Sequence, residues 1–216
     1  EEENGERSMT IGGGVTLAPL FLERKNLSAE VMTEIEKIAK DEQVKKIMFR
    51  IDPLLRERYS YNYLMQFGFL DISLYGYLAD CQIIYLRRNH ERAIRKLRAD
   101  PNFQTFIMDQ RSKDYTVHEQ YRELHRKAAG KTTRSKKTFD LQYRLLEEGH
   151  AVLVGLKYQE RFIAFTYFTF SGAGAISFSA ADDPAFDKLP LYHIINATVL
   201  NYLKAKGVKF MDMGQP

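Results

Sequence analysis

The alternation of apolar and polar positions is clearest near the carboxyl end of the chain. Short apolar residues predict a strand over 175–181, and apolar positions at three- and four-residue spacing predict a helix over 190–206. A second strand is expected over 208–213. Pro190 suits the first turn of this helix and Gly207 suits its end. A strand, a crossover helix and a strand form a βαβ unit, so we expect the two strands to be parallel.

Periodicity predicts a mixture of helices and strands in the rest of the chain. Helices are expected over 28–41, 54–67, 82–99, 117–129 and 138–148, and strands over 15–22, 44–51, 70–77, 103–109, 151–158 and 162–171. The last two strands are joined by a short turn and should form an antiparallel hairpin. A hairpin that leads into a parallel βαβ unit predicts a mixed sheet, and hence an α/β fold of the mixed α+β kind.

The order of these elements divides the chain into two α+β modules. We expect a first module over 1–85, which would lack its opening strands, and a second module over 86–216. Residues 86–100 would form a long helix that links the two modules. Its apolar stripe should run through Ile94 and Leu97, with basic residues on the other faces.

Composition excludes several classes of protein. A hydrophobic content of 44% is ordinary for a folded chain with a core, and no run of 18 apolar residues predicts a transmembrane helix. The acidic, polar amino-terminal stretch is unlike a secretory signal. The single cysteine, Cys81, excludes an internal disulfide, and five scattered histidines predict no metal site. We therefore expect a cytoplasmic protein.

Charge changes the picture more than composition does. The net charge is +4, but residues 87–98 hold six basic side chains and one acid, and residues 122–137 hold seven basic side chains and one acid. The remainder of the chain is therefore net acidic. Two basic patches on an acidic body indicate a polyanionic ligand such as a nucleotide, a pyrophosphate or an RNA end. The alternative is a solvated helix face and a solvated loop.

Four stretches together have the order and spacing of a known family. They are LRRNHERAIRKL at 86–97, ELH at 123–125 with GKTTRSKKT at 130–138 and Gln142, the aromatic strand at 162–171, and PLYH at 190–193 with KGVKFMDMG at 206–214. In this combination the chain resembles the FemAB-like branch of the GNAT acyltransferase superfamily, which is found with polysaccharide and peptidoglycan genes.

The resemblance implies an N-acyltransferase with a GNAT-like mixed sheet. GNAT-type enzymes hold acyl-CoA against a splayed pair of parallel strands, whereas FemAB-type enzymes use aminoacyl-tRNA. The implied reaction moves an acyl or aminoacyl group to an amine of a sugar or cell-wall precursor. No tightly bound cofactor is implied; acyl-CoA, the preferred donor, or aminoacyl-tRNA would be a co-substrate. The alternatives are a non-catalytic module that holds RNA or a nucleotide with the two basic patches, and a degenerate scaffold with a structural role.

Attack of an amine on an activated carbonyl needs groups that position both partners, remove a proton and stabilise the developing oxyanion. Arg134 is the leading candidate for an anchor, because its planar fork of donors suits phosphate and carboxylate. Thr133 and Ser135 flank it and offer hydroxyl groups, although Ser135 would equally cap the next helix. Lys131 in the same loop and Gln142 in the following helix are further candidates for binding donor or substrate.

Four side chains are candidates for proton transfer or substrate binding. His125 and His193 are candidate bases, and the positive end of the helix would lower the pKa of His193. The alternatives are that His125 is a half-buried histidine bonded to a carbonyl and that His193 is a residue at the start of a helix that touches solvent. Asp212, at the end of the last strand, is a candidate base that would otherwise bond to backbone N–H groups at Gly214. Asp182 should lie at the matching end of the neighbouring strand.

Alternation within the last strand gives a more detailed expectation for Asp212. Val208, Phe210 and Asp212 should share one face, and the first two should point into the core. The opposite face should carry Lys209 and Met211. Asp212 would then be partly buried and in need of a partner.

Overall fold

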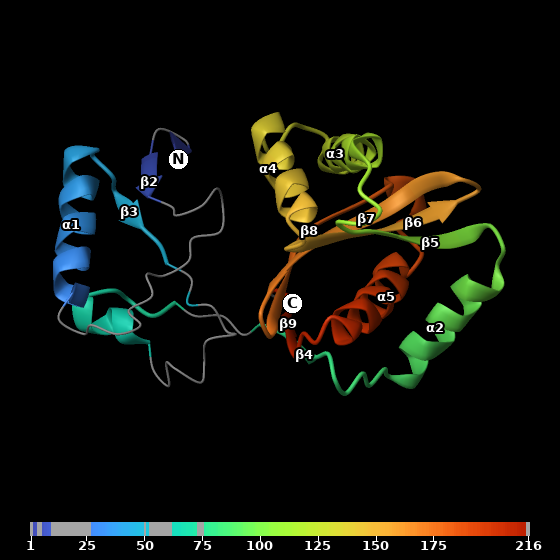
Figure 1. The fold of residues 1–216 in the computed structure, drawn as a ribbon. Helices are drawn as coiled ribbons and strands as arrows, with labels where there is room; N and C mark the ends of the chain where they lie inside the picture. Colours follow the sequence, from blue (N-terminus) through green and yellow to red (C-terminus); the bar gives the residue numbers. More distant parts are fainter. Residues whose placement is uncertain are drawn as a thin grey trace. The chain divides into compact units, whose positions relative to one another are not determined.

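The computed structural model describes residues 2–3, 6–9, 27–49, 51, 62–72 and 76–214. The chain forms two compact units, residues 1–74 and 75–216 (Figure 1). The strand expected over 15–22 and most of the helix expected over 54–67 lie outside the described residues.

The first unit holds a small sheet in the order β1-β2-β3 and one long helix. Its elements are β1 (Glu2–Glu3), β2 (Glu6–Met9), α1 (Leu27–Asp41), β3 (Lys46–Ile47) and the 3-10 helix η2 (Tyr63–Phe67). The helix expected over 28–41 is confirmed. The strand expected over 44–51 is wrong in extent, since only two residues pair with β2. Gly68 ends η2 with φ 82°, the left-handed conformation expected there.

The second unit is built on a six-stranded sheet in the order β4-β9-β8-β7-β6-β5. Its strands are β4 (Leu78–Asp80), β5 (Phe103–Met108), β6 (Ala151–Tyr158), β7 (Arg161–Ser171), β8 (Gly174–Asp182) and β9 (Phe210–Asp212). Its helices are α2 (Arg88–Ala99), α3 (Tyr115–Ala129), α4 (Lys136–Glu147) and α5 (Leu191–Ala205), with the short 3-10 helix η3 (Pro184–Phe186).

Only the β8–β9 pair is parallel; the other neighbours in this sheet are antiparallel. The hairpin, the parallel βαβ unit and the mixed α/β fold are therefore confirmed. The strand expected over 70–77 is wrong: described residues at both ends of that range are not in a strand, and β4 follows them. Because β4 pairs with β9, it belongs to the second unit. That the first unit is an incomplete GNAT-like module remains a prediction.

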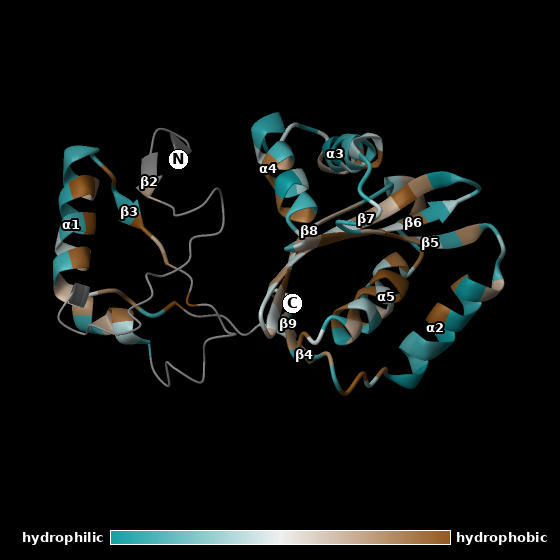
Figure 2. Ribbon diagram, viewed as in Figure 1, coloured by the Kyte–Doolittle hydropathy of each residue, from teal (hydrophilic) through white to brown (hydrophobic). Residues whose placement is uncertain are grey.

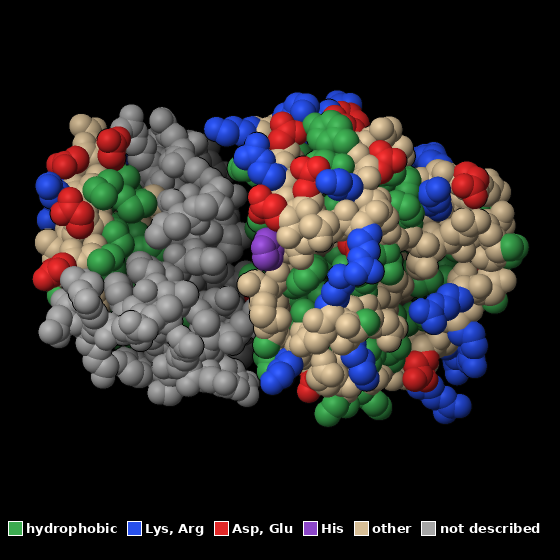
Figure 3. Space-filling model, viewed as in Figure 1, with side chains coloured by type: hydrophobic (Ala, Val, Ile, Leu, Met, Phe, Trp, Pro, Cys, Tyr) green, Lys and Arg blue, Asp and Glu red, His purple; other side chains and the backbone are tan. Residues whose placement is uncertain are grey.

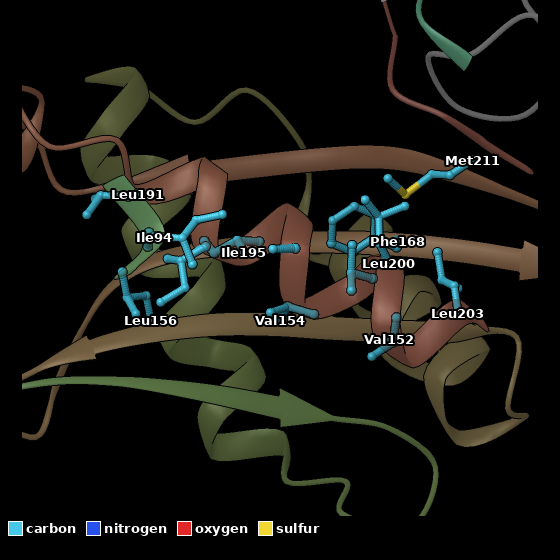
Figure 4. Close-up of a cluster of buried hydrophobic side chains, with 14 of the residues drawn as sticks. Ile94, Val152, Val154, Leu156, Phe168, Leu191, Ile195, Leu200, Leu203 and Met211 are labelled. Atoms are coloured by element: carbon cyan, nitrogen blue, oxygen red, sulfur yellow. The ribbon is translucent and has the colours of Figure 1, made fainter. Parts of the chain in front are cut away.

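Helices cover both faces of the sheet. α2 and α5 lie on one face, called here the α5 face, and α3 and α4 lie on the other, the α3–α4 face (Figure 1). Successive side chains of β6 point alternately into the core on the α5 face and the core on the α3–α4 face. Six consecutive residues from Ala151 are therefore buried. On the α5 face Val154, Leu156 and Phe168 pack against Ile195 and its neighbours (Figure 4). Apolar residues line α5, whereas α2 is hydrophilic over most of its length (Figure 2).

The helix α2 begins six residues later than the periodicity predicts. The Asp80 carboxylate accepts hydrogen bonds from the backbone N–H groups of Gln82 (2.7 Å) and Ile83 (3.1 Å). Such a side-chain bond to the following backbone stabilises a turn and competes with a helix. Ile83 is consequently 74% exposed instead of facing the core, while Ile94 is buried as expected.

The strands β8 and β9 part after a short parallel ladder. Their register pairs Gly174 with Phe210 and Ile176 with Asp212, which is the last pair. Beyond Asp212 the chain stays with the β4 side, because Met213 donates its N–H to the carbonyl of Tyr77 (2.8 Å). The second half of β8 therefore has β7 as its one neighbouring strand among the described residues. A register shift places an extra β8 residue, Phe178, opposite the Tyr167–Phe168 step of β7.

The close packing of β6 on β7 predicts that Gly155→Ala destabilises the second unit. A Cβ atom at Gly155 would lie 2.8 Å from the Phe165 ring and 3.0 Å from the Phe162 ring. Overpacking of this kind costs about 1–3 kcal/mol of unfolding free energy, measurable by urea denaturation. Shortening the obstructing ring with Phe165→Leu should reduce the cost of Gly155→Ala. An equal cost in both backgrounds would contradict this packing.

A second prediction concerns His118, which is fully buried in the α3–α4 core. Neither ring nitrogen has a hydrogen-bond partner among the described residues, and burial lowers the pKa of His118 to about 4. The unfolded chain, with an ordinary histidine pKa of about 6.5, binds the proton first as the pH falls. Stability should therefore be complete above pH 6.5 and fall by up to about 3 kcal/mol toward pH 4.

The variant His118→Phe keeps the volume of the ring and removes the titration. Its unfolding free energy, measured relative to that of the wild type, should rise as the pH falls from 6.5 to 4. The exposed His150 offers a matched control, since His150→Gln should leave the pH profile unchanged. Parallel profiles for the wild type and His118→Phe would refute this role of burial.

Candidate active site

The centre of the candidate site is the edge of β8 over residues 177–182, which no longer pairs with β9 and is called here the parted edge of β8. In open α/β sheets, ligands bind beyond the carboxyl ends of parallel strands. The carboxyl-terminal half of β8 is such an end, and it lies between α3 and α4 on one face and α5 on the other (Figure 1). Polar side chains gather on both sides of it.

On the α3–α4 face, four side chains form the Arg134 cluster, made of His125, Thr133, Arg134 and Ser179. The Nη1 group of Arg134 donates to Nε2 of His125 (2.8 Å) and to Oγ of Ser179 (2.8 Å). The guanidinium also lies 5.8 Å from the centroid of the Phe178 ring. Its Nε and Nη2 groups have no hydrogen-bond partner among the described residues. The arginine is thus held in place by one nitrogen and keeps donors for a ligand.

The same contacts fix the state of His125. Because Arg134 donates to Nε2, that nitrogen carries a lone pair and the proton lies on Nδ1, which is 3.3 Å from Oγ1 of Thr133. Burial and then the Arg134 charge lower the pKa of His125, so the ring is neutral. The lone pair that a general base needs is already engaged by Arg134.

Beneath the Arg134 cluster lies Tyr121, which is fully buried. Its hydroxyl group makes no hydrogen bond of normal geometry among the described residues, although Ser179 is near enough to act on its pKa. Burial raises that pKa to about 12, so the hydroxyl stays protonated. A buried donor without a partner is rare and marks a place where a ligand or water is expected.

On the α5 face, Asp182 at the end of β8 accepts a hydrogen bond from the hydroxyl group of Tyr192 (2.5 Å), in the first turn of α5. Burial, and then this bond, raise the pKa of Tyr192, and the hydroxyl of Tyr121 also acts on it. Asp182 ties the end of the strand to the start of the helix.

The next residue, Asp183, anchors the turn between them. Its carboxylate is 1% exposed and pairs with Lys127 of α3 (2.8 Å) and with Arg161 of β7. Its backbone N–H donates to the carbonyl of Ile163 (2.7 Å). The hydrogen bond from Lys127 is the main reason why the pKa of Asp183 is lowered.

The second basic patch is largely neutralised by such pairs. Arg122 and Arg126 pair with Glu119 or Glu123 on α3. Lys136 pairs with Asp140 one turn later. With Lys127, four of the seven basic side chains of residues 122–137 therefore have an acidic partner, and Lys131, Arg134 and Lys137 have none among the described residues.

The remaining candidates, Ser135 and Lys131 of the basic loop and Gln142 of α4, make no hydrogen bond to the Arg134 cluster among the described residues. The hydroxyl of Ser135 accepts from the N–H of Thr138 (3.3 Å) and caps α4, which is the structural alternative stated for it. Lys131 is exposed and makes no ion pair with the described residues. Gln142 lies in α4 and is 4% exposed. Its side-chain amide has no hydrogen-bond partner among the described residues, whereas its backbone carbonyl accepts from the hydroxyl group of Tyr167 (2.8 Å).

The other two base candidates also lie apart from the Arg134 cluster. The ring of His193 lies 4.2 Å from the ring of His90 on α2, measured between centroids. Burial and then His90 lower the pKa of His193, rather than the helix end that the sequence suggested. The Asp212 carboxylate is 1% exposed and accepts from the N–H of Gly214 (2.9 Å).

Two expectations about the last strand are wrong. Asp182 and Asp212 do not lie at matching ends, because Asp212 pairs with Ile176 and Asp182 lies six residues farther along β8, at about 3.3 Å a residue. Phe210 is 37% exposed and Met211 is fully buried, so the expected faces are wrong for these two residues, whereas Val208 lies in the core as expected. The α5 core takes Met211 because the sheet register, set by β8, fixes which side chains point to the helix.

Sequence reasoning missed Ser179, Tyr121 and Tyr192. Tyr192 stands in the PLYH stretch beside the histidine that drew attention. Tyr121 is one helical turn before His125, a spacing that places both on one side of α3. Ser179 had no distinguishing signal, because one serine in a strand of small residues is equally expected on a solvent face.

Two further searches of the described residues were negative. No three histidine, cysteine, aspartate or glutamate side chains come together there as a metal site would need. Within that same part of the chain, no helix combines the length and the apolar character needed to cross a membrane.

Comparison with solved structures shows what the fold is similar to. L-PGS from Bacillus licheniformis superposes with a TM-score of 0.62 at 13% identity, over 88% of this chain and 58% of that one. The C-terminal domain of a putative lysylphosphatidylglycerol synthetase from Agrobacterium fabrum gives 0.58 at 10% identity, over 86% and 59%. FemX gives 0.56 at 12% identity, over 87% and 67%. The chain thus spans less than two thirds of the first two structures. No curated protein matches it.

The family comparison covers the second unit almost completely. The family described as acetyltransferase (GNAT) domain matches residues 86–216, which is more than half of the chain. The matched range holds the parted β8–β9 pair, the Arg134 cluster and α5. The resemblance to the GNAT superfamily is therefore confirmed, and the chain belongs to the GNAT acetyltransferase family.

Proposed function

We propose that the second unit transfers an acyl group from an activated donor to an amine, with the reaction centre at the parted edge of β8. The observation that carries this proposal is the β8–β9 register, which ends at the Ile176–Asp212 pair and leaves the rest of β8 without a second neighbouring strand among the described residues. Backbone groups on that side of β8 are then available to a ligand. A preorganised N–H there suits the oxyanion that forms during acyl transfer.

The donor fits the α5 side of this edge. The start of α5 follows β8 directly, and a helix start favours the negative charge of a pyrophosphate. Lys188, in the exposed turn before α5, makes no ion pair with the described residues. We infer acyl-CoA as the donor, because its pyrophosphate suits this turn; aminoacyl-tRNA is the competing donor.

The acceptor fits the α3–α4 side, where Arg134 keeps donors free. A carboxylate or phosphate on the acceptor would take the two open guanidinium positions, as a bidentate ligand does. His125 then acts as a positioning residue for Arg134, since its lone pair is engaged. An anionic sugar or cell-wall precursor that carries an amine offers both the anionic group for Arg134 and the nucleophile for acyl transfer.

Asp182 is the residue that we place at the proton-transfer step. His125 and Asp212 are engaged by Arg134 and by the Gly214 N–H, whereas one oxygen of Asp182 is free of partners among the described residues. The ammonium of the acceptor loses a proton to this carboxylate, and the amine attacks the thioester carbonyl. A C–N bond forms, the C–S bond breaks, and the leaving thiolate takes up a proton.

The alternative function, a module that binds RNA or a nucleotide with both basic patches, has weaker support. Four of the seven basic side chains of the second patch are paired within the chain. The acyltransferase function needs an arginine with open donors beside the parted edge of β8, and Arg134 meets that need.

The direct test is transfer from radiolabelled acetyl-CoA to a panel of amino sugars and anionic amines, with aminoacyl-tRNA as the competing donor. Arg134→Gln should lower kcat/KM by roughly 10-fold to 100-fold, because a charged hydrogen bond is worth about 1.5–3 kcal/mol. Arg126→Gln is the matched control, since that charge pairs with Glu123 on an exposed helix face.

Donor binding gives a separate readout of the same proposal. Acetyl-CoA should raise the melting temperature of the wild type and of Arg134→Gln alike, because a ligand of the native state stabilises it. The proposed function would be refuted if the protein neither bound nor used any donor of either class. Transfer that Arg134→Gln leaves unchanged would remove Arg134 from the site.

A further inference from the structure

The first basic patch differs from the second in having no internal partners. Six basic side chains are exposed along α2 and at its start, and none of them forms an ion pair within the part of the chain that the structure describes. They are Arg87, Arg88, Arg92, Arg95, Lys96 and Arg98. Figure 3 shows the corresponding Lys and Arg side chains gathered at the lower right, where Figure 1 places α2. Unpaired cations at this density create a positive potential that attracts anionic partners.

Large apolar side chains lie next to these cations. Ile83 is 74% exposed and Tyr85 is 84% exposed, in the segment that leads from β4 to α2. The Asp80 turn, which delays the start of α2, leaves this segment outside the helix. Ile84 and Leu86 still pack against the core, whereas Ile83 and Tyr85 point away from it. Folding does not require two large apolar residues to be exposed beside a cationic helix, so their exposure indicates a binding surface.

A shallow cavity of about 440 Å³ lies along the same helix. It is lined by Leu86, Glu91, Ile94, Arg95, Arg98 and Ala99. Apolar atoms form most of its wall, and two arginines and one acid, Glu91, border it. A ligand with an apolar part and an anionic part matches this lining.

We propose that α2 and the segment before it dock on an anionic lipid bilayer. The six cations lie at the level of the anionic headgroups, where each basic residue adds to binding. Tyr85 suits the interface between headgroups and acyl chains, and Ile83 gains by leaving water for hydrocarbon. The apolar wall of the cavity accommodates part of an acyl chain under Arg95 and Arg98. The protein then lies on the membrane surface.

A bilayer explains these residues better than RNA does. Both ligands are polyanions and would satisfy the arginines. A nucleic acid is bound by several aromatic rings interleaved with cations. On this surface Tyr85 is the one exposed aromatic ring among the described residues, because the aromatic residue of α2, His90, packs on His193. Exposed Ile83 gains from hydrocarbon and has no role against a phosphate backbone.

The test is co-sedimentation of the full chain with vesicles of phosphatidylglycerol and phosphatidylcholine, or of phosphatidylcholine alone. We expect binding to the anionic vesicles only. The triple variant Arg88→Gln, Arg92→Gln, Arg95→Gln should bind at least tenfold more weakly, since each cation contributes about a fivefold factor. The control removes three paired cations, with Lys113→Gln, Arg126→Gln and Lys136→Gln, and should bind as the wild type does.

The apolar part has its own variant. Ile83→Ser with Tyr85→Ser should weaken binding at high salt, where the charge contribution is screened and insertion dominates. Transfer activity in solution should be unchanged in all these variants, so this proposal stands or falls separately from the proposed function. Equal binding to both vesicle types, equal loss in the control triple variant, or binding of a single-stranded RNA without binding of anionic vesicles would each overturn it.

Discussion

The buried carboxylate of Asp183 holds the end of β8, and the candidate site depends on it. The second half of β8 has one neighbouring strand among the described residues, so its position rests on β7 and on what ties down its end. Lys127 from α3 and Arg161 from β7 converge on Asp183, and a buried charge without such partners would be strongly destabilising. The strand can therefore part from β9 without losing its place, and both faces of its edge stay defined.

From this anchor the two sides of the site follow. On one face Ser179 of β8 takes a hydrogen bond from Arg134, which in turn fixes the tautomer of His125. On the other face Asp182 binds Tyr192 and so sets the start of α5 against the strand. One strand thus positions an arginine with open donors and a carboxylate with an open oxygen. That pairing suits the binding of an anionic amine and the removal of its proton.

Periodicity predicted the second unit well, because strong alternation and helical spacing there reflect two well-packed cores. The parallel β8–β9 pair and the helix between them were placed within a few residues. Prediction failed where a local polar contact overrides propensity, as at Asp80 before α2, and where sheet register decides a face, as at Phe210 and Met211. Within the site, Arg134 was found because arginine in such a loop is distinctive. Ser179 and Tyr121 were not, since their importance arises from contacts between distant segments. Charge counting likewise could not separate the paired patch on α3 and α4 from the unpaired patch on α2.

The central claim is that the parted edge of β8 receives the donor. Hydrogen–deuterium exchange of the full chain with and without acetyl-CoA tests it at that edge. Backbone N–H groups of residues 177–182 that point away from β7 should exchange more slowly when acetyl-CoA is bound, together with those at the start of α5. The amides of β6 (Ala151–Tyr158), which lie between β5 and β7, serve as the internal reference and should not change. Protection that falls elsewhere, with the edge of β8 unaffected in a complex shown to form, would contradict the account.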